Sequence, residues 1–336
     1  MAELNDKLDI TVEELEEHLG EKKLPEFIHD CEKTFVSRTD AIVEEFCADK
    51  SKRAVFVSGP TSSGKTTFTM RLAAGLSAHG RKAEFLSLDD YYQMCALKYD
   101  RDGRPDFETI DSLDIDRAAA DVADLIAGKK VKPPRFNFMT RQIEERDDSE
   151  AFSIGEDGVL VVEGLHGLSE KIAGAASAEH STKVFIMPYG NVFCDTKLMD
   201  SEEIRMLRRI VRDSRHRGAS AVATVDYWPM IARSEEAYYQ DYLTRADIHV
   251  NSFLGYESLI IAPLALHDIN ESLELTKNGK LPPSIFMRQS EKNRPYADLS
   301  AALDKCSRLV RHLEKIPVVD PAHVPTESIL NEFIGS

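Results

Sequence analysis

A glycine-rich stretch near position 60 ends in a lysine and two threonines. It reads Gly59-Pro60-Thr61-Ser62-Ser63-Gly64-Lys65-Thr66-Thr67 and fits the pattern G-x-x-x-x-G-K-[ST]. A short apolar run, 54–57, precedes it, and a helical pattern over about 65–79 follows it. Glycines let the backbone curl so that its N–H groups face a phosphate, and the start of a helix favours the negative charge. The stretch therefore predicts a binding site for a mononucleoside triphosphate, and we call it the phosphate loop.

The polar residues of the phosphate loop have separate expected tasks. Lys65 can reach the β- and γ-phosphates, and the Thr66 hydroxyl can bind Mg²⁺. The other residues expected to line the nucleotide are Gly59, Thr61, Ser62, Ser63, Gly64 and Thr67. The pattern alone does not separate a kinase from an ATPase or a GTPase. No N-K-x-D element that would read a guanine is present, which disfavours a GTPase.

Acidic residues follow two further apolar runs. Asp89 and Asp90 come after a run at 84–88, and Glu163 ends a run at 159–162. Ligands of parallel sheets bind beyond the carboxyl ends of the strands, so we expect these acids beside the phosphate loop. Asp89 or Asp90 could accept a proton from a substrate hydroxyl or hold Mg²⁺ through water, although helix capping is an alternative. Glu163 is expected to position the metal, with a solvent-facing strand end as the alternative.

Arginines are concentrated in one short helical segment of an acidic chain. They are Arg205, Arg208, Arg209, Arg212, Arg215 and Arg217. Several of them are one helical turn apart and share a face. Arginine suits bidentate phosphate contacts and the charge of a phosphoryl-transfer transition state. We interpret the segment as part of a helical lid, about 200–230, that closes over phosphates. A solvated, salt-bridged helix is the alternative.

The elements that would position these residues read as an α/β fold. Further apolar runs at 183–187 and 247–250 complete a set of short strands that alternate with helices, which indicates a parallel sheet covered on both faces. Residues 1–50 read as an acidic helical extension, and 51–270 as the nucleotide-binding domain. Residues 98–150 have little periodicity and read as a long functional connection. Residues 271–336 read as a helical extension whose apolar face serves the core or a homo-oligomer contact.

Composition limits the setting of the chain. The 336 residues carry a net charge of −16, which disfavours unspecific binding to nucleic acid or to anionic lipid. The five cysteines have no C-x-x-C spacing, which argues against a disulfide framework or a zinc site. No apolar run approaches the ~20 residues of a membrane span, and the acidic start has no export-signal pattern. We therefore expect a cytoplasmic protein.

Taken in order, the motifs resemble the phosphoribulokinase/uridine kinase family, and more closely its uridine kinase branch. Besides the phosphate loop, they comprise Ser87-Leu88-Asp89-Asp90-Tyr91-Tyr92, Pro134-Arg135-Phe136-Asn137-Phe138, Val162-Glu163-Gly164 and the arginine segment 208–218. The similarity spans about 52–265. It implies a parallel P-loop sheet flanked by helices, ATP as phosphoryl donor, Mg²⁺ as cofactor and a small molecule as acceptor.

The resemblance also implies roles for individual residues. Asp89 matches the catalytic carboxylate that takes the proton of the attacking hydroxyl, and Thr66 and Glu163 match the rest of the Mg²⁺ site. Tyr92 matches an aromatic residue near the nucleoside, and Asp102 or Asp106 matches the acid that binds the ribose hydroxyls. The arginines that match phosphate-contacting lid residues are Arg209, Arg212 and Arg217.

One motif departs from the family pattern. Where the family has a Tyr and a His that recognise the pyrimidine, this chain has Phe136 and Arg141. We expect these two residues to contact the acceptor, but the change weakens the substrate prediction more than the reaction prediction. The expected activity is an ATP-dependent kinase acting on a hydroxyl, with a nucleoside 5′-hydroxyl favoured. A kinase for a sugar phosphate or another small alcohol, and a nucleotide-binding regulatory ATPase, are the alternatives.

Overall fold

A five-stranded parallel sheet forms the centre of the molecule in a computed structural model, which describes residues 7–93, 97–137, 142–144, 146–174, 176 and 178–335. The strand order is β10-β7-β2-β6-β3. The strands are β2 (Ala54–Ser58), β3 (Ala83–Ser87), β6 (Val159–Glu163), β7 (Ser181–Met187) and β10 (Ile248–Asn251). Each of them falls on an apolar run of the sequence, so the predicted parallel α/β sheet is confirmed.

Alternate residues of these strands enter two apolar layers. Val55 and Val57 of β2 belong to one layer, whereas Ala54 and Phe56 belong to the other. Because helices cover both faces, every residue of β2 and β6 is buried. This explains why the strands read as continuous apolar runs rather than as an alternating pattern.

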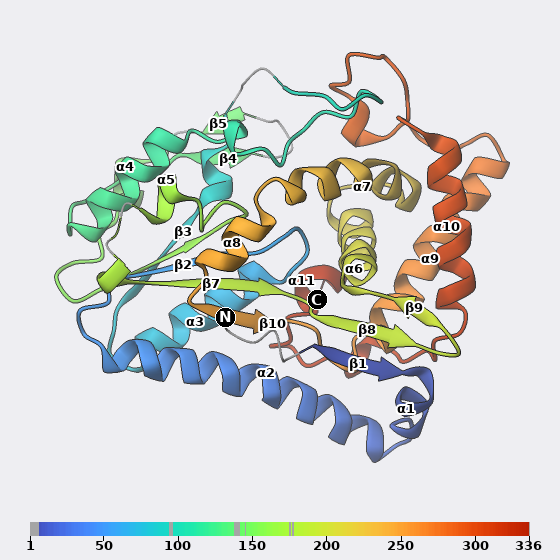
Figure 1. Ribbon diagram of the computed structural model, residues 1–336, viewed down its shortest axis with the longest axis horizontal. Helices are drawn as coiled ribbons and strands as arrows, with labels where there is room; N and C mark the ends of the chain where they lie inside the picture. Colours follow the sequence, from blue (N-terminus) through green and yellow to red (C-terminus); the bar gives the residue numbers. More distant parts are fainter. Residues whose placement is uncertain are drawn as a thin grey trace.

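α2 (Lys23–Ala48) and α3 (Lys65–Ala78) share an apolar cluster with one face of the sheet, whereas α4 (Ile115–Ile126), α5 (Glu170–Ala173) and α8 (Tyr239–Arg245) share one with the other face (Figure 1). Four further helices join the first cluster but pack mainly on one another, beside the sheet (Figure 1): α6 (Ser201–His216), α7 (Ala221–Glu236), α9 (Ser258–Lys277) and α10 (Leu299–Leu313). None of the helices in the described part of the chain is long and apolar enough to cross a membrane.

The start of the chain contributes a strand as well as helices. β1 (Leu8–Thr11) pairs in parallel with β8 (Gly190–Phe193), which pairs in turn with β9 (Lys197–Met199). α1 (Val12–Glu17) follows directly, with a capping box between Thr11 and Glu14. The sequence pattern predicted helices over 1–50 but not this strand, because its pairing partner lies about 180 residues away along the chain.

The segment 98–150 is more ordered than its sequence suggested. It contains α4 and the hairpin of β4 (Arg135–Asn137) and β5 (Gln142–Glu144). Asp114 caps the start of α4 by accepting a hydrogen bond from the Arg117 N–H, 3.2 Å away. The expectation of an unpatterned connection was wrong for α4, which buries Ile115, Ala118, Val122 and Leu125 at helical spacing.

The end of the chain folds back into the centre of the molecule. α10 packs its apolar face against α7 and α9, so this face serves the core of the same chain. The short helix α11 (Asn331–Ile334) lies beside α6 (Figure 1). Both terminal regions therefore pack on the sheet domain. The predicted domain boundaries at 50 and 270, and association between copies, stay predictions.

Candidate active site

The phosphate loop links β2 to α3, as its sequence predicted. Two of its glycines are required by geometry: a side chain on Gly59 would overlap the carbonyl oxygen of Ile186, and Gly64 has φ = 86°. A left-handed conformation favours glycine because it has no Cβ. Lys65 begins the helix, and its Nζ donates a hydrogen bond to the Pro60 carbonyl at 3.0 Å. The lysine therefore folds back over the loop.

Two hydroxyl groups of the loop have no protein partner. The Ser62 and Ser63 side chains are buried, and their Oγ atoms make no hydrogen bond within the described part of the chain. Buried polar groups are normally paired, so an unpaired hydroxyl indicates a missing ligand. A phosphate oxygen, which accepts hydrogen bonds, fits both groups. The Thr66 hydroxyl lies at an exposed position of the helix start, where it is accessible to a metal ion.

Two carboxylates lie beside this loop at the ends of neighbouring strands. Ser87 is the register partner of Glu163, so Asp89, two residues later, follows at the same edge. Although the Asp89 side chain reaches solvent, desolvation by the surrounding protein raises its pKa, while Lys65 and Arg217 act in the opposite direction. Burial and the charge of Asp89 raise the pKa of Glu163 to about 8. These two acids would be stabilised by a cation between them.

These residues fit a magnesium ion that is held mainly by its nucleotide. The described residues contain no group of three or more His, Cys, Asp or Glu side chains that could bind a metal by themselves. Magnesium commonly uses one or two protein carboxylates together with waters and substrate phosphates. The residues that would hold it here are Thr66, Asp89 and Glu163.

The adjacent acids Asp89 and Asp90 have different surroundings. Asp90 accepts a hydrogen bond from the Phe136 N–H at 3.4 Å and forms an ion pair with Arg146 at 2.8 Å. Its carboxylate therefore braces the β4–β5 hairpin. Asp89 follows the strand end next to Glu163, and the charge of Lys65 acts to lower its pKa. This position makes Asp89 the candidate acid at the phosphate loop.

The arginine segment forms α6, and its first arginines are buried ion pairs. Arg205 donates two hydrogen bonds to Glu235, at 2.7 and 2.8 Å. Arg208 donates two to Glu257, at 2.9 and 2.5 Å. All four side chains are at most 7% exposed, so α6 is an internal helix and not a solvated one. The structure places α6 against the phosphate loop, and its motion as a lid stays a prediction.

Thr61 is the point at which the phosphate loop is fixed to α6 and α7. Its hydroxyl accepts a hydrogen bond from Arg209 at 2.6 Å, and its carbonyl accepts one from Arg205 at 3.3 Å. Its N–H donates to Glu235 at 3.3 Å. Every polar group of Thr61 is therefore engaged, which couples the arginine helix directly to the loop.

Asp213 gathers the later arginines into one cluster. It forms ion pairs with Arg209 at 3.1 Å, Arg212 at 3.0 Å and Arg217 at 3.6 Å. Although burial opposes ionisation, these arginines lower the pKa of the Asp213 carboxyl. One carboxylate does not neutralise three guanidinium groups. The cluster therefore keeps positive charge beside the phosphate loop, and phosphate contact by Arg209, Arg212 and Arg217 stays a prediction.

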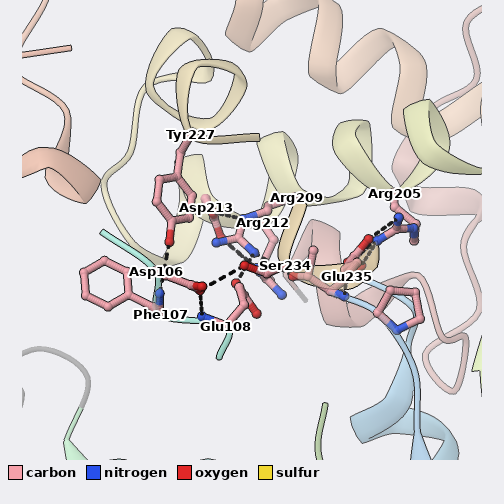
Figure 2. Close-up of polar contacts among 12 residues, drawn as sticks. Asp106, Phe107, Glu108, Arg205, Arg209, Arg212, Asp213, Tyr227, Ser234 and Glu235 are labelled. Atoms are coloured by element: carbon pink, nitrogen blue, oxygen red, sulfur yellow. Dashed lines mark hydrogen bonds and ion pairs between the residues drawn. The ribbon is translucent and has the colours of Figure 1, made fainter. Parts of the chain in front are cut away.

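The structure separates the two acids predicted to bind the acceptor. Asp106 accepts a hydrogen bond from the Ser234 hydroxyl at 2.9 Å, and it lies across from the arginine cluster (Figure 2). Asp102 instead pairs with Arg101 at 3.4 Å and with Arg104 at 3.1 Å. Of the two alternatives, the structure brings Asp106 to the site and leaves Asp102 in a separate ion-pair group.

An aromatic pair lines the side of the site next to Asp89. The rings of Tyr92 and Phe136 are 5.5 Å apart, and the Tyr92 hydroxyl donates to the Phe107 carbonyl at 3.3 Å. Burial and the charge of Asp89 raise the pKa of Tyr92, so its hydroxyl stays protonated. The predicted residues Phe138 and Arg141 lie outside the described residues.

Glu108 is a site residue that the sequence analysis did not identify. Its carboxylate lies 3.5 Å from Arg209, and its charge raises the pKa of Asp89. His166 holds its backbone, because Nε2 lies 2.8 Å from the Glu108 carbonyl and Nδ1 lies 2.9 Å from the Tyr242 hydroxyl. Burial lowers the pKa of His166 to about 4, so the ring is neutral, with its proton on Nε2 facing the carbonyl. No local motif marks either residue.

Comparison with known proteins shows the family of the chain. A family model, phosphoribulokinase/uridine kinase, matches residues 55–255. Uridine kinases of Staphylococcus aureus strains JH9 and Newman are 25% identical over 185 residues, which is 55% of this chain and 79% of theirs. The solved structure of a possible uridine kinase from Bacillus stearothermophilus aligns with a TM-score of 0.43 at 17% identity, covering 64% of this chain and 98% of its own.

Proposed function

Since the chain belongs to the phosphoribulokinase/uridine kinase family and is a kinase of a small molecule, we propose that it transfers the γ-phosphoryl group of ATP to a hydroxyl. The observation that carries this proposal is the position of Asp89 at the edge of the sheet, two residues after the register partner of Glu163 and beside the phosphate loop. A carboxylate beside a phosphate loop can take a proton from an alcohol at the point where phosphate arrives.

In the proposed reaction, the acceptor oxygen attacks the γ-phosphorus as the bond to the β–γ bridging oxygen breaks. The proton of the hydroxyl passes to Asp89, and ADP leaves with the bridging oxygen. The surrounding protein and the nearby acids raise the proton affinity of Asp89, which suits it to accept this proton. Magnesium, when bound, would neutralise charge on the β- and γ-phosphates.

Positive side chains of the chain itself would stabilise the transferred group. Lys65 is expected to follow the β- and γ-phosphates, and the Asp213 cluster supplies Arg209, Arg212 and Arg217. The hydrogen bond from Arg209 to Thr61 fixes one of these guanidinium groups at the loop before any substrate arrives. Donors fixed in advance need little reorganisation during the reaction.

A nucleoside is the acceptor that the surroundings of Asp89 favour. Asp106 and Glu108 can accept hydrogen bonds from vicinal hydroxyls, and Tyr92 with Phe136 offers an aromatic surface. A sugar phosphate would need free cations, but Arg104 is paired with Asp100 at 2.8 Å. Arg135 is likewise paired, with Glu150 at 2.9 Å. These pairings support a neutral acceptor over a phosphorylated one.

The proposal is tested by following ADP release from Mg·ATP in a screen of nucleosides, polyols and sugar phosphates. We expect release that depends on the acceptor and is fastest with a nucleoside. Asp89→Asn is the control, because it should abolish the acceptor-dependent part. Slow hydrolysis that is the same with every alcohol would instead identify a regulatory ATPase. Turnover of phosphorylated sugars alone would identify a sugar phosphate, and not a nucleoside, as the acceptor.

A further inference from the structure

The segment 325–335 crosses the phosphate loop from the far end of the sequence. The side chain of Ile329 fills the space beside Gly64, so that no side chain could be added there. The Ser328 hydroxyl lies 3.1 Å from that of Tyr256, which precedes α9. This segment lies outside the 55–255 region that the family model matches. Its contacts with the loop therefore come from outside the matched region.

A carboxylate of this segment occupies the start of the loop helix. Oε2 of Glu332 accepts a hydrogen bond from the Thr67 N–H at 3.3 Å and from the Thr67 hydroxyl at 3.2 Å. Thr67 is the third residue of α3, and the first N–H groups of a helix have no partner within the helix. These are the groups that a helix start offers to an anion. Glu332 is thus an anion supplied by the protein itself.

The neighbouring orphan hydroxyls show that Glu332 does not satisfy the whole loop. Ser62 and Ser63 are buried and remain without a hydrogen-bond partner among the described residues. The charge of Glu332 also contributes to the raised pKa of Glu163, so it acts on the same group of acids. The carboxylate therefore lies within the electrostatic field of the site and adds negative charge where phosphates must enter.

The backbone of the segment is fixed, whereas the Glu332 side chain is only half-buried. Ile329, Leu330 and Phe333 are fully buried, and the Arg208 guanidinium lies 4.9 Å from the centre of the Phe333 ring. Releasing these three side chains together would expose a large apolar surface. Among the described residues, turning the Glu332 side chain toward solvent breaks two hydrogen bonds, both to Thr67. The second movement is therefore the less costly one.

We propose that Glu332 is an internal competitor for the phosphate loop, which sets nucleotide affinity by holding Thr67 until a phosphate displaces its carboxylate. This inference rests on the proposed use of the loop for nucleotide. Affinity falls in proportion to the fraction of molecules whose binding groups are free, so removal of the competing charge tightens binding. The effect acts on the phosphates and not on the base or the sugar.

The test is a calorimetric measurement of the Kd of three ligands, Mg·ATP, inorganic tripolyphosphate and adenosine. The proteins are the wild type, Glu332→Gln, Glu332→Ala and the control Glu327→Gln. Glu327 lies in the same segment, is 85% exposed and only approaches Arg71 at 3.9 Å. Gln keeps the shape and an acceptor oxygen while removing the charge, and thermal melting verifies the fold of each variant.

We expect both Glu332 variants to bind Mg·ATP and tripolyphosphate tighter by on the order of tenfold. Adenosine and the Glu327→Gln control should show no change. Equal or weaker ATP binding by Glu332→Gln overturns the inference, as does an equal gain for adenosine. If neither the wild type nor any variant binds ATP, both the proposed function and this inference fail. If all bind ATP alike and Lys65→Ala does not, only the inference fails.

Discussion

Glu163 and Asp89 lie at the ends of neighbouring strands, and burial together with the Asp89 charge raises the pKa of Glu163 to about 8. The unfolded chain loses this proton near the ordinary value of 4.5. Between these two values the folded state binds more protons than the unfolded state, so its stability falls as the pH rises. In the absence of a metal and nucleotide, the pair is therefore a source of instability above neutral pH.

The first prediction follows from that sign. Glu163→Gln removes the ionisable group, so the variant should lose less stability than the wild type when the pH rises from 5 to 8. We expect the difference between the two free energies of unfolding to change by about 1–3 kcal/mol over this range, in favour of the variant. Urea unfolding at the two pH values, without metal or nucleotide, measures this difference. A parallel loss of stability in the two proteins over this pH range would contradict the prediction.

The second prediction concerns Lys65. Lys65→Ala should abolish phosphoryl transfer and leave the fold intact, because Lys65 is a partly exposed side chain whose ammonium donates a hydrogen bond to the Pro60 carbonyl of its own loop. Activity and thermal melting are measured together. The matched control is Lys82→Ala on the surface, where Lys82 pairs with Glu84 at 2.7 Å. Full activity in a folded Lys65→Ala protein would refute the assignment of the nucleotide site.

The third prediction separates the two adjacent aspartates. Asp89→Asn keeps the shape and removes the proton acceptor, so kcat should fall by about 10²–10⁴. Asp90→Asn should cost much less, since Asp90 braces the hairpin through Phe136 and Arg146. Steady-state kinetics of the two variants decides between them. A larger loss for Asp90→Asn means that the wrong acid has been assigned.

The local parts of this site were predictable from the sequence. Parallel strands buried on both faces give continuous apolar runs, and the phosphate loop is a contiguous motif between a strand and a helix. Both signals lie within short windows. The acids Asp89 and Glu163 follow from strand ends, so their meeting at one edge needs only the topology of the sheet.

Contacts between distant segments were not predictable in this way. Glu332 reaches Thr67 across 265 positions of the chain, and β1 pairs with a strand about 180 residues away. Glu108 lies in a polar segment with no periodicity, and its place depends on Arg209 and on the buried His166. The sequence showed that the arginine segment is positively charged. Which of its arginines form buried ion pairs depends on partners in α7 and just before α9, and this was not predictable.

The fourth prediction distinguishes structural from functional arginines. Arg208→Met leaves the buried carboxylate of Glu257 without its partner, which should reduce the free energy of unfolding by about 3–5 kcal/mol. Arg217 is 42% exposed and its ion pair with Asp213 is long, at 3.6 Å, so Arg217→Ala should change stability little and lower kcat/KM. Chemical denaturation and kinetics are measured on both variants. If Arg208→Met mainly lowered kcat/KM and Arg217→Ala mainly lowered stability, the assignment of Arg208 as structural and Arg217 as functional would be wrong.

The fifth prediction concerns the acceptor and compares Asp106 with Asp102. The structure brings Asp106 to Ser234 and the arginine cluster, whereas Asp102 is held by Arg104. Asp106→Asn keeps the hydrogen bond from Ser234 but weakens the acceptor oxygen that a ribose hydroxyl would use. We expect it to raise the KM for the nucleoside about tenfold, with the KM for ATP nearly unchanged.

Desolvation raises the pKa of Asp106. The wild type should therefore lose affinity for the acceptor toward acid pH, and the Asp106→Asn variant should not show this loss. Asp102→Asn should have the smaller effect on the KM for the nucleoside. An Asp102→Asn variant with the larger effect would return Asp102 to the acceptor site and remove Asp106 from it.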